Sequence, residues 1–103
     1  MEFLVVMRIR DPKDPEVQRR RVELRPAHLK RASGFREKGH VLLGGAIFDA
    51  EGNVAGSAAI ARFDTRTELD AWLKDDPWTT GGVWQDFEII PFRIAEHYPQ
   101  AKR

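Results

Sequence analysis

The distribution of apolar residues predicts four strands. The first apolar run covers 3–9 and is apolar at almost every position, which indicates a strand buried on both faces. Two further runs, 41–48 and 54–63, flank the polar segment 49–53, whose length and glycine predict a five-residue hairpin loop. The last run, 83–92, also places large apolar residues on both faces. The chain therefore contains four candidate strands, two of them joined as a hairpin.

The first long connection has helical signals interrupted by a proline. Asp14 and Pro15 suit the start of a helix, because the carboxylate can accept a first-turn N–H and proline has none to leave unpaired. A proline in a helix interior removes a hydrogen bond and clashes with the preceding turn. We therefore expect this helix to end near Leu24 and a second segment to run from Pro26 to Lys38.

The second long connection predicts one short helix. Thr65 and Glu68 have the spacing of a capping box, in which each side chain bonds a free backbone N–H of the first turn. The next apolar positions follow helical spacing, at Leu69 and Trp72. Pro77 ends the pattern, and we expect 79–82 to be a loop.

The resulting order, β-α-β-β-α-β, is typical of an α+β protein with the ferredoxin-like fold. That fold has a four-stranded antiparallel sheet with both helices on one face. Two helices cover only one face, yet the first and last strands are apolar on both. A second copy packed sheet to sheet would cover the other, so we expect a homodimer.

Composition narrows the class of protein. The chain has 103 residues, enough for one domain, and a net charge of +1, which gives no indication of a nucleic-acid or membrane partner. The basic run 19–21 is interpreted as a solvated helix face. The absence of cysteine excludes disulfides and thiolate chemistry and fits the cytoplasm. No segment has the pattern of a signal peptide or the length of a membrane-spanning helix.

Strand directions bring three polar residues to one end of the sheet. His28 lies near the start of its helical segment, Asp76 follows the second helix, and Ser57 lies early in the third strand. Histidine beside a carboxylate is an acid–base unit, because the carboxylate fixes the ring tautomer and stabilises the cation. Trp78 and Trp84 are placed to line a pocket there. The alternative is that the pair only ties two helices together.

The remaining candidate residues give weaker indications of function. Arg25, one turn from His28, can bind an anionic group of a substrate or form a surface ion pair. A nucleophilic role for Ser57 is disfavoured, because the serine lies in a strand and lacks the strand-to-helix elbow of hydrolases. The histidines and acids do not have metal-ligand spacing, so we expect no metal site.

Several short motifs, taken together, resemble the YciI-like (YCII-related) family: Arg25-Pro26-Ala27-His28-Leu29, Gly56-Ser57, Asp76-Pro77-Trp78, Gly82-Val83 and Pro91-Phe92. The resemblance runs from Phe3 to Phe92, which suggests a single domain over 1–94 and a polar tail over 95–103. It implies a dimeric α/β barrel built on the ferredoxin-like fold.

The resemblance also implies a function. Family members carry a His-Asp pair at the positions of His28 and Asp76, with a strand serine at Ser57. One relative is a dehydrochlorinase acting on a chlorinated hydroxyhydroquinone. We therefore expect a cofactor-independent enzyme of the lyase or isomerase kind that acts on a small polar molecule, either anionic or neutral. In that enzyme Arg25, Trp78 and Trp84 would contact the substrate. The alternative is a ligand-binding or accessory module that uses the same pocket without turnover.

Overall fold

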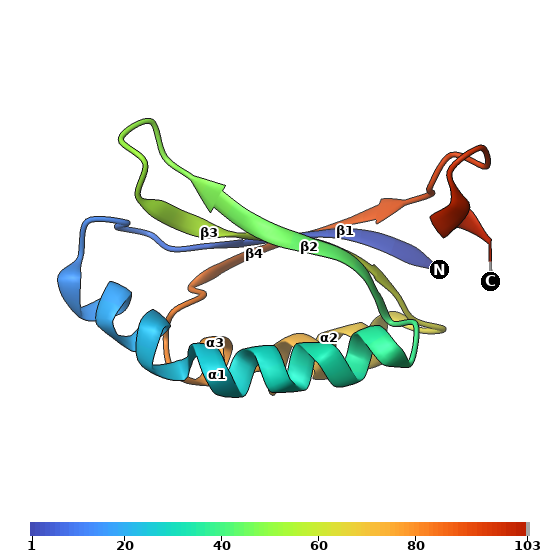
Figure 1. The fold of residues 1–103 in the computed structure, drawn as a ribbon. Helices are drawn as coiled ribbons and strands as arrows, with labels where there is room; N and C mark the ends of the chain where they lie inside the picture. The colour runs from blue at the N-terminus through green and yellow to red at the C-terminus, as the bar shows by residue number, and fades with distance from the viewer. Residues whose placement is uncertain (103) are drawn as a thin grey trace.

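The computed structural model describes residues 1–102 and has the predicted element order. The strands form one antiparallel sheet in the order β2-β3-β1-β4, and all helices longer than one turn lie on a single face, so the ferredoxin-like fold is confirmed (Figure 1). The elements are β1 Glu2–Arg8, α1 Pro15–Glu37, β2 Val41–Phe48, β3 Val54–Arg62, α2 Arg66–Lys74, α3 Pro77–Thr80, β4 Asp86–Phe92 and a 3-10 turn at Pro99–Ala101.

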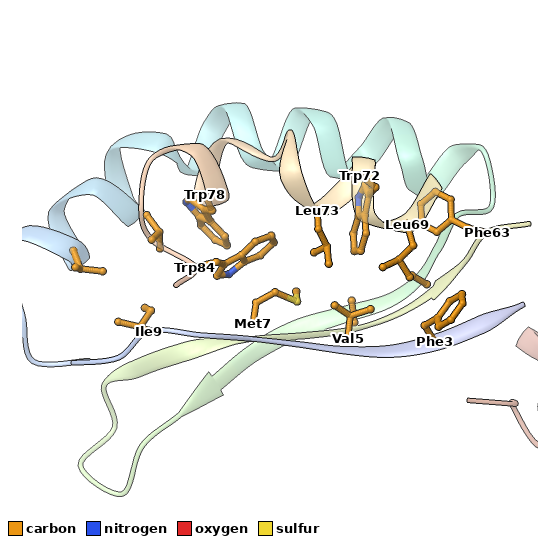
Figure 2. Packing of buried hydrophobic residues seen from close by; sticks show 14 residues of the cluster. Phe3, Val5, Met7, Ile9, Phe63, Leu69, Trp72, Leu73, Trp78 and Trp84 are labelled. Carbon is orange, nitrogen blue, oxygen red and sulfur yellow. The ribbon is translucent and has the colours of Figure 1, made fainter. Parts of the chain in front are cut away.

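The core lies between the helices and one face of the sheet. Alternate residues of β1 are buried there and meet the inner face of α2 and two tryptophans that follow it (Figure 2); the cluster includes Phe3, Val5, Met7, Leu69, Trp72, Leu73, Trp78 and Trp84. The capping box forms as predicted, since the Glu68 N–H donates to the Thr65 hydroxyl over 3.2 Å. This end of α2 is therefore fixed by local sequence.

The opposite face of the sheet is apolar and uncovered. Leu43, Ile90 and Phe92 keep 65%, 38% and 40% of their surface exposed. A shallow depression of about 370 Å³ lies on this side between Leu4, Leu43 and Ile60. One chain therefore leaves a strip of apolar surface on this face of the sheet.

The predicted break at Pro26 is wrong: α1 is one helix of 23 residues with the proline inside it. Proline leaves the Val22 carbonyl without its helical donor. Contacts made by the turn that precedes Pro26 offset this loss. The Trp78 indole N–H donates to the Arg21 carbonyl over 3.1 Å, and Gly81 packs so closely on Leu24 that a Cβ there would lie 2.2 Å from the leucine.

Two boundaries near the end of the chain also differ from prediction. Residues 77–80 form the short helix α3, and β4 begins at Asp86 and not at Val83. The backbone N–H groups of Val83 and Trp84 both donate to the Trp78 carbonyl, over 2.9 and 3.0 Å. They close a turn onto α3 and are unavailable to the sheet. The apolar pair at 83–84 is thus buried in the helical layer.

The position of Pro26 leads to a stability prediction. Because Pro26→Ala restores a helical donor at an exposed site, we expect the free energy of unfolding to rise by about 1–3 kcal/mol. Chemical denaturation measures the change. An unchanged or lower stability would mean that the helix depends on the proline geometry.

Candidate active site

The candidate site is built on a contact between His28 of α1 and Asp76 at the start of α3. The Nδ1 atom of His28 lies 3.0 and 3.1 Å from the two carboxylate oxygens of Asp76. The carboxylate only accepts hydrogen bonds, so Nδ1 carries the proton and Nε2 is the unprotonated nitrogen of the neutral ring. Nε2 has no hydrogen-bond partner among residues 1–102, and 14% of the His28 side chain is exposed. The basic nitrogen is therefore not tied to another protein group.

Asp76 is held in place by the local sequence that follows it. It is the N-cap of α3: its Oδ1 accepts the Trp78 backbone N–H over 2.9 Å, and Pro77 occupies the first helical position. Its Oδ2 also faces Arg31 of α1 over 3.4 Å. Only 3% of the Asp76 side chain is exposed. The carboxylate is thus buried, anchored by a cap and neutralised by a guanidinium.

Two tryptophans fix the plane of the histidine ring. Trp78 stacks on His28, with ring centroids 3.8 Å apart and planes inclined by 12°. Trp84 meets the same ring edge-on, with centroids 5.3 Å apart. One face of the imidazole is therefore covered by indole, which restricts rotation of the ring.

Ser57 of β3 joins the site through Trp84. The Trp84 indole N–H donates to the Ser57 hydroxyl oxygen over 3.2 Å, which leaves the hydroxyl proton free to donate elsewhere. The preceding residue must be glycine, because a Cβ on Gly56 would lie 2.1 Å from the Met7 carbonyl oxygen. The structure places Ser57 beside His28 by way of Trp84, and no direct bond joins the two.

These residues line a cavity of about 540 Å³ between α1 and the strands β2 and β3. All six residues expected at the site, including Arg25, lie on its wall. The part of the wall that β2 and β3 contribute includes many small residues: Gly44, Gly45, Ala46, Ala58 and Ala59. Small side chains here leave the room that a ligand needs.

The sequence interpretation missed three arginines. Arg31 pairs with Asp76, and Arg21 and Arg36 line the cavity with Arg25. Helical spacing places Arg21, Arg25, His28 and Arg36 on one face of α1, but that signal was hidden by the expected break at Pro26. That these arginines share one face of the helix can be inferred only when α1 is known to be continuous.

The arrangement suits proton transfer. Nε2 can take a proton from a molecule in the cavity, and Asp76 would stabilise the resulting imidazolium. Ser57 can donate a hydrogen bond to an oxygen of that molecule. Within 1–102, no group of three or more histidine or acidic side chains is placed to hold a metal ion. Across the same residues, no helix is long and apolar enough to cross a membrane.

The chain belongs to the YCII-related domain family, whose model matches residues 1–93. Protein YciI of Escherichia coli is 30% identical over 80 residues, covering 72% of this chain and 82% of the relative. An uncharacterized protein of Haemophilus influenzae is 29% identical over 85 residues, covering 77% of this chain and 87% of its own length.

A solved structure shares the fold. It is the 5-chloro-2-hydroxyhydroquinone dehydrochlorinase of Burkholderia phenoliruptrix, in complex with 2,5-dihydroxybenzoquinone. The two superpose with a TM-score of 0.78 at 22% sequence identity, over 94% of this chain and 98% of the other. At this identity the likeness establishes the architecture.

The buried carboxylate leads to a stability prediction. Asp76→Asn removes the charge that neutralises Arg31 and an acceptor of His28, so we expect a loss of about 3 kcal/mol in the free energy of unfolding. The neighbouring Asp75 is exposed, and Asp75→Asn should change stability by less than about 0.5 kcal/mol. Urea denaturation compares them. Equal effects would contradict the anchoring role of Asp76.

Proposed function

We propose that the protein is a cofactor-independent enzyme that removes a proton from a small molecule by means of the His28–Asp76 pair. The observation that carries the proposal is an imidazole on the wall of a cavity, with one nitrogen held by a buried carboxylate and the other without a partner among residues 1–102. Lyase or isomerase chemistry needs this unit and a place for the substrate. The fold shared with a dehydrochlorinase supports the choice of class.

In a dehydrochlorination, each group would have one task. His28 Nε2 takes a proton from the substrate, the electrons of the broken bond form a new double bond, and chloride leaves with the electrons of the carbon–chlorine bond. No electron acceptor is needed. Asp76 stabilises the imidazolium until its proton passes to water, and Ser57 donates a hydrogen bond to a substrate oxygen that gains negative charge.

The alternative is a ligand-binding module that uses the same cavity without turnover. The two functions predict the same binding residues and differ in whether His28 accelerates a reaction. Unlike a wholly buried structural histidine, His28 lies on a cavity wall with 14% of its side chain exposed, and its Nε2 has no partner among residues 1–102. That difference favours the enzyme.

We further propose that the functional unit is a homodimer that covers the uncovered sheet face. Leu4 of β1, Leu43 of β2 and Phe92 of β4 all lie on that face, so one strip of apolar surface crosses three strands. A second copy packed on it would remove the strip from water. The cavity beside His28 lies on the other side of the sheet, and it would stay open.

The catalytic proposal is tested with 5-chloro-2-hydroxyhydroquinone by measuring chloride release. His28→Gln and Asp76→Asn should each lower the rate by about two orders of magnitude or more. The double variant should lose little more than either alone, because the two groups act as a unit. His97→Gln, in the exposed C-terminal segment, is the matched control and should retain full activity. Binding of the compound without chloride release would favour the ligand-binding alternative.

The dimer is tested by sedimentation equilibrium. The 11.8 kDa chain should sediment as a particle of twice that mass at micromolar concentration. Leu4→Asp places a charge on the uncovered face and should give a monomer, whereas Val22→Asp, at a position 63% exposed on α1, should leave the dimer intact. A monomeric wild type would rule the dimer out.

A further inference from the structure

The six arginines of α1 divide into two groups by their partners. Arg19 bonds Glu16 and Glu23 on the outer side of the helix, and Arg20 also pairs with Glu16. Hydrogen bonding to Glu16 raises the pKa of the Arg19 guanidinium above its ordinary value. Arg31 pairs with Asp76. These cations are therefore already neutralised within the chain.

The other three arginines all line the cavity. Arg21, Arg25 and Arg36 have no carboxylate within ion-pair distance in the part of the chain that the structure describes. The one carboxylate on the cavity wall is Asp76, which His28 and Arg31 already occupy. The cavity thus carries positive charge that nothing in residues 1–102 balances.

These cations stand on both sides of the proton-accepting nitrogen. At 1.5 Å per residue, Arg25 lies about 4.5 Å along α1 from His28, and Arg36 lies about 12 Å away in the opposite direction. Arg36 thus lies eleven residues beyond Arg25, about 16.5 Å along the axis, so a ligand held by both lies between two long, flexible side chains. The cavity wall contributed by β2 and β3 includes small residues, among them Gly44, Gly45 and Ala58.

We propose that the cavity binds a small ring compound carrying two acidic groups, one held by Arg21 and Arg25 and the other by Arg36. Guanidinium groups bind carboxylates and similar oxyanions through paired hydrogen bonds, and the small residues of β2 and β3 leave room for a flat apolar body. The ring would then lie beside His28 Nε2. This inference rests on the proposed function because it names the class of molecule used at the same site.

The test measures binding by isothermal titration calorimetry with three probes that share a benzene ring and carry two, one and no negative charges: terephthalate, benzoate and terephthalamide. We expect terephthalate to bind about tenfold more tightly than benzoate, and terephthalamide, which has no charge, to bind at least about a hundredfold more weakly than terephthalate. Arg25→Gln and Arg36→Gln should each weaken terephthalate binding about tenfold. Arg19→Gln is the matched control, an arginine on the same helix that already has partners, and should have no effect.

Three results would overturn the inference. Terephthalamide binding as tightly as terephthalate would show that charge is not recognised. Equal losses of terephthalate affinity in Arg19→Gln and Arg25→Gln would show that the overall positive charge of the helix attracts the ligand, and that no specific site does. No binding of any probe would exclude the class of ring dianions. None of these results affects chloride release by the His28–Asp76 pair, so failure here is distinguishable from failure of the proposed function.

Discussion

The burial of the Asp76 carboxylate is the constraint on which the candidate site depends. A buried charge must be neutralised and hydrogen-bonded, and Asp76 meets this need with the Trp78 N–H, His28 and Arg31. Because these partners come from α1 and α3, satisfying the carboxylate also fixes the two helices together. The orientation of His28 is a consequence of that requirement.

The tryptophans extend this constraint to the sheet. Trp78 stacks on His28 and bonds the Arg21 carbonyl in the turn before Pro26, and Trp84 bonds Ser57 on β3. The imidazole is therefore held by a carboxylate on one edge and by indole rings on its face and side. Rigid placement of this kind is what efficient proton transfer requires, because a misplaced base loses much of its rate advantage.

The sequence predicted the parts of the fold that depend on local signals and strand alternation. The capping box of α2, the hairpin at 49–53 and the meeting of His28 with Asp76 follow from spacing and strand direction. The continuity of α1 through Pro26 could not be predicted in this way. It depends on contacts of Leu24 and Arg21 with Gly81 and Trp78, which lie more than fifty residues further along the chain.

The fate of Val83 and Trp84 was unpredictable for the same reason. From sequence alone, an apolar pair directly before a strand is assigned to that strand. Val83 and Trp84 lie in the helical layer because their backbone N–H groups bond the Trp78 carbonyl. Likewise, nothing in the sequence distinguishes Arg31 from the other arginines of α1. Its role follows only from its ion pair with Asp76 in the folded chain. Tertiary partners, and not propensity, decided each of these cases.

The central claim is that Asp76 fixes the tautomer of His28 so that Nε2 is the free base. The most direct measurement is the pair of ¹⁵N chemical shifts of the His28 ring, recorded at a pH where the ring is neutral. The account predicts a protonated Nδ1 and an unprotonated Nε2 in the wild type, and a mixture of tautomers in Asp76→Asn. A wild-type ring with its proton on Nε2 would contradict the account.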